Sequence, residues 1–130
     1  MAEAAFLSEG WFEHLRTHGA ELPERPGASG RVQHVVTGTP DGEVRNVISM
    51  VDGRTADVSV GGDDTADVTD TNTHADALAL AAGELDASVL FMQGRTKMAG
   101  DMGKVMALMP LTDSDEYRTA IATLAERTAF

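Results

Sequence analysis

The sequence predicts an α/β protein of the α+β type, in which an antiparallel sheet packs against helices. Two patterns predict this class. Between closely spaced turn residues in the first half of the chain, apolar residues recur with a period of two, as in strands joined by hairpins. At the start and in the second half they recur with the period of a helix. The chain has 130 residues, of which 42% are hydrophobic. We therefore expect residues 1–130 to form a single domain around one core.

A short amphipathic helix is expected to open the fold, over about residues 9–18. Ser8 is a good N-cap residue, and Trp11 and Leu15 belong to an apolar stripe at helical spacing. Gly19 follows as a typical stop signal. The helix is therefore expected to end at about residue 18.

A loop and an antiparallel group of strands are expected next. Residues 19–30 hold two of the four prolines, so we expect a loop, and this loop and the last helix are the candidates for a lid over a pocket. Short turns rich in Gly and Asp then separate three strands that are expected to pair as hairpins, with a fourth strand beside them. The four strands are expected over residues 31–36, 43–51, 55–60 and 66–71.

Helices alternate with short strands in the second half of the chain. A helix is expected between Asn72 and Gly83, capped by Thr73 or Asn72, because apolar residues recur there at helical spacing. The continuous apolar run 88–92 predicts a buried strand, and residues 95–99 alternate as another.

Two helices are expected to close the chain. The first has one face made almost entirely of methionine, at positions i, i+3, i+4 and i+7: Met102, Val105, Met106 and Met109. Pro110 is expected to end or kink it. Residues 113–116 match the D-x-x-E capping pattern of the second helix. The inner stripe of that helix is expected to be Tyr117, Ile121 and Leu124.

The charge of the chain excludes several classes of partner. Ten Lys and Arg against 21 Asp and Glu give a net charge of −11. Nucleic acid is not expected as a partner, because binding phosphate backbones requires a clustered basic face. Stable association with anionic membranes is disfavoured for the same reason. Composition alone leaves open whether the acidity reflects salt adaptation or a GC-rich coding bias.

Several kinds of site and location are also excluded. The chain has no cysteine, which removes disulfides, thiolate nucleophiles and Cys-ligated metal centres. No window approaches the roughly 18 apolar residues of a membrane span, and the N-terminus lacks the pattern of a secretory signal. The chain ends Thr128-Ala129-Phe130, which is not a peroxisomal tripeptide. We therefore expect a cytoplasmic protein.

Three blocks of sequence in the second half resemble a known family. They are Ala66–Thr69 (ADVT), Gly83–Leu85 (GEL) and Phe91–Gly103 (FMQGRTKMAGDMG). In this order they resemble the sterol carrier protein 2 (SCP2) sterol-transfer family, over about a third of the chain.

The resemblance implies a fold and a function. The family's fold is α/β (α+β), with a mainly antiparallel five-stranded sheet and helices packed on one face, which together enclose a hydrophobic tunnel. Its members bind fatty acyl chains, acyl-CoA, sterols and other lipids without doing chemistry on them. The strongly acidic charge departs from the neutral or basic members, which argues against coenzyme A phosphates and anionic membranes.

Methionines cluster where the resemblance implies a tunnel wall. Five of the seven methionines fall within residues 92–109, and thioether side chains repack easily around ligands of varied shape. Plain core filling is the alternative. The residues expected to line an apolar cavity are Met92, Met98, Met102, Val105, Met106, Met109 and Ile121.

A few polar side chains are candidates for contacts with a ligand's head group. His34 alternates with Val32 and Val36, so it is expected on the inner face of the sheet, either as a hydrogen-bonded core residue or as a ligand contact. Arginines near the mouth could pair with a carboxylate. The candidates are His34, Arg45 and Arg95, with Arg54 as a further arginine.

No catalytic residue, metal site or cofactor is expected. His14 and His18 stand at i, i+4 but lack the glutamate of a metalloprotease helix. The acidic cluster Asp63, Asp64, Asp67 and Asp70 lacks the ligand register of an EF-hand. The glycines at 94, 100 and 103 match no phosphate-binding loop, and no serine lies in a G-x-S-x-G elbow.

Three functions remain. The first is a non-enzymatic carrier that binds a lipid or another hydrophobic small molecule. The second is a small enzyme in which the tunnel guides cyclisation or isomerisation, with His34 or Tyr117 as the polar side chain. The third is an interaction module that packs on itself as a homodimer or on a partner enzyme.

Overall fold

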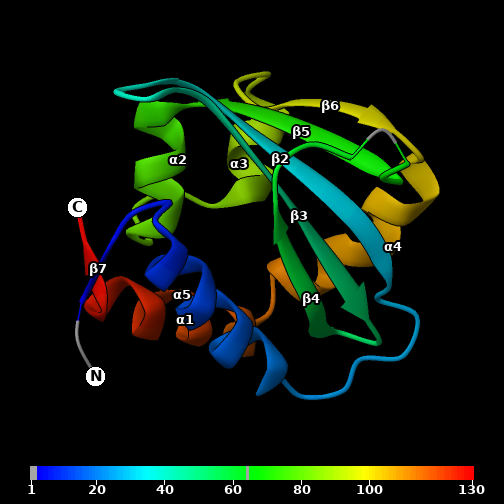
Figure 1. The fold of residues 1–130 in the computed structure, drawn as a ribbon. Coiled ribbons are helices and arrows are strands. Elements are labelled where there is room, and N and C mark those ends of the chain that lie inside the picture. The colour runs from blue at the N-terminus through cyan, green and yellow to red at the C-terminus, as the bar shows by residue number, and fades with distance from the viewer. Residues whose placement is uncertain (1–2, 64) are drawn as a thin grey trace.

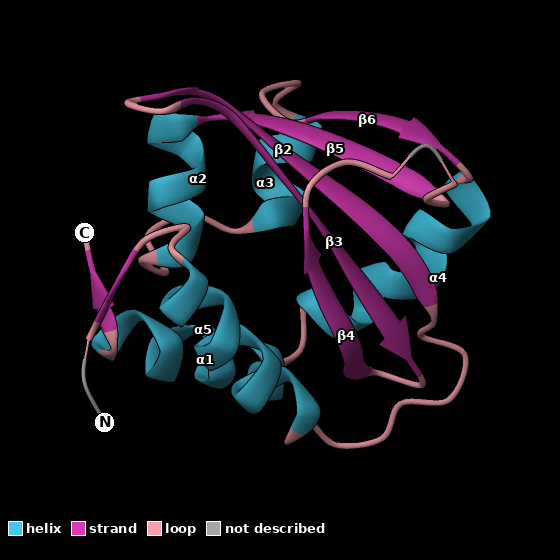
Figure 2. Ribbon diagram, in the orientation of Figure 1, coloured by secondary structure: helices cyan, strands magenta, loops and turns pink. Residues whose placement is uncertain are grey.

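A five-stranded sheet in the order β4-β3-β2-β5-β6 carries the fold, and helices cover one of its faces (Figures 1 and 2). The computed structural model describes residues 3–63 and 65–130, so Asp64 of the acidic cluster lies outside the described residues. The strands are β1 (Ala4–Ala5), β2 (Gly30–Thr39), β3 (Gly42–Val51), β4 (Arg54–Val60), β5 (Val68–Thr73), β6 (Lys97–Gly100) and β7 (Thr128–Ala129). The helices are α1 (Glu9–Ala20), α2 (His74–Ala81), α3 (Ala87–Met92), α4 (Met102–Thr112) and α5 (Asp115–Glu126).

The expected α+β class is confirmed, with a sheet that is mixed. The pairs β2–β3, β3–β4 and β5–β6 are antiparallel, whereas β2 and β5 at the centre are parallel. The parallel pair arises because the segment between β4 and β5, described at residues 61–63 and 65–67, carries the chain from one edge back across the sheet to a place beside β2 (Figure 1). Short turns favour neighbouring hairpins, but this segment is long enough to cross two strands.

Strand side chains alternate between two faces of the sheet. On β2, Val32, His34 and Val36 point to the face that the helices cover, which we call the inner face. Gln33 and Val35 point to the opposite face, which we call the outer face.

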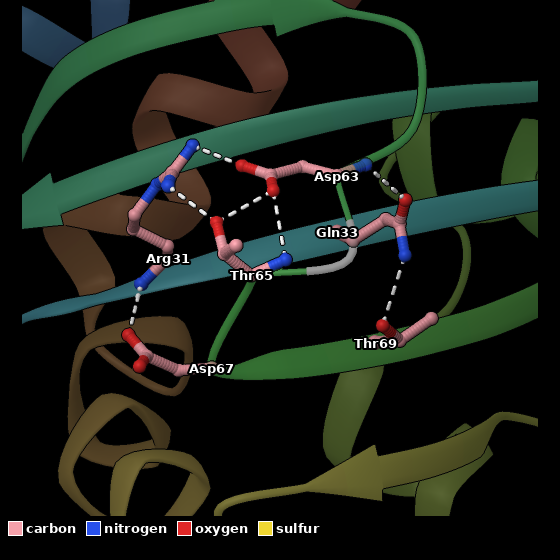
Figure 3. Close-up of polar contacts among 6 residues, drawn as sticks. All are labelled: Arg31, Gln33, Asp63, Thr65, Asp67 and Thr69. Atoms are coloured by element: carbon pink, nitrogen blue, oxygen red, sulfur yellow. Dashed lines mark hydrogen bonds and ion pairs between the residues drawn. The ribbon is translucent and has the colours of Figure 1, made fainter.

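Residues 61–63 and 65–67 lie over the outer face and are tied to it by polar contacts (Figure 3). Gln33 Oε1 accepts a hydrogen bond from the backbone N–H of Asp63 (2.8 Å), and Gln33 Nε2 donates to the hydroxyl of Thr69 (3.0 Å). The Asp63 carboxylate pairs with the guanidinium of Arg31 and accepts from the hydroxyl and backbone N–H of Thr65. These hydrogen bonds, with the Arg31 charge, lower the pKa of Asp63. The network therefore fixes the crossing segment.

Side chains cap the starts of four helices. Ser8, Thr73, Asp101 and Ser114 accept hydrogen bonds from first-turn N–H groups of α1, α2, α4 and α5. The last helix therefore begins one residue later than the capping pattern predicts. Asp113 instead follows α4 as its C-cap residue.

The apolar run 88–92 forms helix α3, so the predicted strand was wrong. Short apolar runs fit a strand or a buried helix equally well by periodicity. Gly94 decides between them: it has a φ of +72° just after the helix, and Arg95 N–H donates to Leu90 C=O (2.9 Å), as in a Schellman end.

Pro110 lies inside α4 and does not end it. Proline lacks the N–H that would bond to the carbonyl of Met106, one turn earlier. Both residues are exposed at this position, so water can satisfy that carbonyl.

Two buried clusters hold the helices to the sheet. One joins Trp11 and Phe12 of α1 to Val58 of β4 and Leu124 of α5. The other joins Leu108 and Leu111 of α4 to Ala28 in the loop before β2. Among the helices of the described residues, none is both long and apolar enough to cross a membrane.

Candidate ligand cavity

A cavity of about 490 Å³ lies between the inner face of the sheet and the helices. Its wall is largely apolar. The sheet contributes Val32, Val36, Ile48, Met50 and Val68, and the helices contribute residues such as Trp11, Leu15, Leu80, Phe91, Leu108 and Leu124. This volume is within the usual range for small-molecule sites, roughly 300–1,000 Å³.

Four of the predicted apolar contacts lie on the cavity wall: Met98, Val105, Met109 and Ile121. The other three point away from it. Met92, Met102 and Met106 have exposed fractions of 83%, 44% and 67%. Met92 is displaced because its segment is a helix, in which it ends α3 on the solvent side.

The buried face of α4 is rotated from the predicted one. Each helical residue turns the side chain by about 100°, so a face centred on Val105, Leu108 and Met109 leaves Met102 and Met106 at its edge. The helix is apolar around most of its circumference, so the spacing of its apolar residues fits two overlapping candidates for the buried face. Packing against Ala28 selects the face that includes Leu108.

A polar row crosses this apolar wall. In the strand register, His34 of β2 lies opposite Asn46 of β3 on one side and Asp70 of β5 on the other. All three line the cavity. The next inner-face row, two residues along each strand, is apolar: Ile48, Val32 and Val68. Three of the wall's polar side chains therefore lie at one level of the sheet, and Asn72 lies on the same face one row further, beside Val36.

Asp70 holds His34 in place. Nδ1 of His34 lies 2.9 and 2.8 Å from the two carboxylate oxygens of Asp70. Burial alone would lower the pKa of His34, but the charge of Asp70 and the hydrogen bond to it outweigh burial and raise that pKa. On α5, burial and then the charge of Asp70 raise the pKa of Tyr117. The field of Asp70 thus reaches across the cavity to Tyr117.

Three buried polar atoms on the cavity wall have no hydrogen-bond partner within the described part of the chain. They are Trp11 Nε1, His18 Nε2 and Asn46 Oδ1. Asn46 is 3% exposed. Buried polar groups in native proteins are almost always paired, so these atoms are candidates for contact with a ligand or with ordered water.

Sequence reasoning missed Asn46 and Asp70. A signal existed for Asn46, because the period of two places it on the same strand face as Val44 and Ile48. For Asp70 no local signal existed, since its approach to His34 depends on the parallel pairing of β2 with β5.

The three arginines that were expected to contact a ligand's head group lie outside the cavity. Arg45 follows the alternation to the outer face, where its Nε donates to Glu43 (2.8 Å). Arg95 is held by an ion pair with Asp76 at the start of α2. Arg54 donates to the carbonyl of Leu22 (2.9 Å). None of the three lies on the wall that the described residues form.

The segment expected as a lid is hydrogen-bonded to the β3–β4 turn. Arg25 N–H donates to the carbonyl of Asp52 (2.6 Å), and Gly53 N–H donates to that of Ala28 (2.9 Å). Asp52 N–H also donates to the Ser29 hydroxyl (2.9 Å). These three hydrogen bonds therefore hold the segment against the β3–β4 turn.

The histidine pair of α1 does not belong to a metal cluster in the described residues. His14 and His18 stack with ring centroids 6.4 Å apart. Over residues 3–63 and 65–130, no group of three or more His, Cys, Asp or Glu is placed to hold a metal ion.

Comparisons with known proteins agree with this architecture. The model of the SCP-2 sterol transfer family matches residues 12–113. A conserved hypothetical protein of Thermus thermophilus, described as a possible sterol carrier protein, has a similar structure (TM-score 0.73, 16% identity, covering 95% of this chain and 94% of that one). So does palmitated SCP2L2 of Aedes aegypti (TM-score 0.63, 23% identity, 82% and 94% covered).

A third likeness is confined to part of a larger protein. A double mutant of the sec-alkyl sulfatase PisA1 has a TM-score of 0.59 and 25% identity, covering 83% of this chain and 17% of that one. Among curated protein sequences, none matches this chain.

Proposed function

The chain belongs to the SCP-2 sterol transfer family, and we propose that it is a non-enzymatic carrier that holds one lipid or other hydrophobic molecule beneath its sheet. The observation that carries this proposal is the cavity of about 490 Å³ with a largely apolar wall. The Aedes aegypti protein of the same fold, which is palmitated, supports a lipid as the occupant.

Desolvation supplies the binding energy. Each CH₂ group that leaves water contributes about 0.8 kcal/mol, so a long apolar body needs few polar contacts. Val105, Met109, Met98 and Ile121 are the proposed apolar contacts. Methionine side chains allow the wall to adapt to ligands of different shape.

Native mass spectrometry of freshly purified protein tests the proposal. We expect a co-purified mass that solvent extraction identifies as a lipid. A ligand-free dimer would instead favour an interaction module, and would contradict the carrier if the protein also failed to take up Nile red.

Two tryptophan variants on one helix locate the site. Met109→Trp places a larger side chain in the cavity. We expect it to weaken Nile red binding by about tenfold or more, because the packed wall cannot move aside to make room for the dye. Met106→Trp makes the same change on the exposed side of α4, and we expect unchanged affinity. Equal affinities in the two variants would remove α4 from the site.

An enzyme is the second candidate, because the His34–Asp70 pair has the geometry of an oriented general base. Turnover of an added hydrophobic substrate that is lost in His34→Ala would favour it. Binding without turnover favours the carrier.

We place the carrier in the cytoplasm, with no nucleic acid or stably bound membrane as a partner. The net charge of −11 supports the exclusion of nucleic acid and anionic membranes as partners, because like charges repel. The protein should stay unbound when anionic vesicles are floated through a density gradient at low salt. Co-flotation would contradict this part of the proposal.

A further inference from the structure

The polar row marks one level of a largely apolar cavity, in which Asn72, one row further, already accepts a hydrogen bond from the Thr96 hydroxyl. Asn46, His34 and Asp70 lie side by side on three strands, and the neighbouring row of Ile48 and Val32 offers only hydrocarbon. Directly opposite residues of an antiparallel pair have Cβ atoms about 5 Å apart. Asn46 and His34 are therefore close enough to bind one ligand atom between them.

Within the described protein alone, the hydrogen bonds of this polar row are incomplete. Asp70 holds His34 through Nδ1, so Nε2 is the ring nitrogen left for a ligand. Asn46 Oδ1 is buried, lines the cavity and has no donor among the described residues. A buried acceptor without a donor is costly. What completes the row must bring an O–H or N–H group into the cavity.

We propose that Asn46 and His34 together bind the hydroxyl group of a neutral lipid alcohol. This inference rests on the carrier function proposed above. The ligand's O–H donates to Asn46 Oδ1, and its oxygen lies beside Nε2 of His34, which donates to it whenever the ring carries its second proton. The hydrocarbon body lies along the apolar rows of the wall.

Charge selects an alcohol over a carboxylate. A carboxylate has no proton to donate to Asn46, and it would lie beside Asp70, whose negative charge also raises the pKa of Tyr117 on the facing helix. Asp70 already pairs with His34 and offsets any positive charge on its ring. Alkanes fit the wall but leave Asn46 unpaired, so the chemical class is a long-chain alcohol or a sterol-like alcohol.

Three probes with the same twelve-carbon chain test the proposal: dodecane, 1-dodecanol and dodecanoate. Their dissociation constants are measured by displacement of Nile red from the wild type and from Asn46→Leu. Comparing the dodecanol-to-dodecane ratio between the two proteins cancels the different water solubilities of the probes. We expect Asn46→Leu to shift that ratio by about tenfold against dodecanol.

Gln33→Leu is the matched control, because it makes the same type of change at a buried amide on the outer face. It should leave the ratio unchanged. An equal ratio in wild type and Asn46→Leu, or tighter binding of dodecanoate than of dodecanol to the wild type, would overturn the hydroxyl site while the carrier function stands. Failure of every probe, Nile red included, to bind would overturn the carrier function itself.

NMR of the wild type gives a test that needs no variant. The chain has two asparagines, Asn46 and Asn72, and Asn72 Oδ1 already accepts from the Thr96 hydroxyl (2.5 Å). Dodecanol should shift the side-chain amide signals of Asn46 more than those of Asn72, and dodecane should not reproduce the difference. Equal shifts with both probes would contradict the proposal. Cholesterol as an added probe separates a sterol-like from a straight-chain alcohol.

Discussion

Two buried amide side chains, Gln33 and Asn46, lie on neighbouring strands but on opposite faces of the sheet. Gln33 is 5% exposed, and both ends of its amide are bonded, to Asp63 and to Thr69. Asn46 is 3% exposed, and its Oδ1 has no partner in the described structure. The outer face thus satisfies its own polar groups, whereas the inner face leaves one for a guest. The difference separates an amide that holds the structure together from one that, in the proposed function, is available to a ligand.

Replacing the outer amide should have the largest effect on stability. Gln33→Leu leaves the N–H of Asp63 and the hydroxyl of Thr69 without their partner. We expect the free energy of unfolding to fall by about 2 kcal/mol, measured by urea denaturation. A loss no larger than that of an exposed substitution would show that the crossing segment does not depend on this amide.

Replacing the inner amide should act in the opposite direction. Asn46→Leu removes a buried acceptor that lacks a donor and adds apolar area, so we expect the ligand-free protein to gain about 1 kcal/mol. Thermal unfolding of delipidated protein measures this gain. A loss as large as that of Gln33→Leu would erase the contrast between the faces.

The exposed part of the outer network should matter less. The Arg31–Asp63 ion pair has side-chain exposures of 44% and 23%, and solvent screens exposed pairs so that they contribute little. Arg31→Met should therefore lower the free energy of unfolding much less than Gln33→Leu does, and less still in high salt. A loss as large as that of Gln33→Leu would mean that the ion pair, not the amide, anchors the segment.

The smallest expected effect is a dependence of stability on pH, and it should come from His34 on the inner face. Folding raises the pKa of His34 above 6.5, because Asp70 outweighs burial. The resulting stability is fully present below about pH 6.5 and is lost as the pH rises through the folded-state pKa. Asp70 of β5 is the titratable group that pairs with His34, and Tyr117 of α5 lies within the field of Asp70.

Urea denaturation across pH 6 to 9 should show this decline in the wild type and not in His34→Gln. Asp63 of the outer face has a lowered pKa, so it does not titrate in this range. The same decline in His34→Gln would assign it to another group.

The fold was predictable to the extent that its signals are local. Period-two alternation gave β2, β3 and β4, and the caps Ser8 and Thr73 gave the starts of α1 and α2. The parallel pairing of β2 with β5 was not predicted, since only packing of the whole sheet decides it. The resemblance of residues 66–108 supplied the five-stranded architecture that periodicity alone left open.

The chemical character of the site was more predictable from the sequence than its individual residues were. An apolar wall with a histidine was expected, and His34 lies on it. Met106 was expected there because an almost wholly apolar helix carries no polar stripe to fix its rotation. Asn46 and Asp70 become neighbours of His34 only through strand register, which no single segment of sequence contains.

The parallel pair at the centre of the sheet has a consequence for the order of folding. His34 and Asp70 are 36 residues apart in the chain, whereas β2, β3 and β4 are joined by tight turns. Closing the longer loop costs more entropy, so we expect the three-stranded meander to form first and β5 to join it later. Pulse-labelled amide exchange should show protection in β3 before β5. The apolar interior would then come into existence only at the final pairing, so that a lipid has nothing to enter until folding is complete.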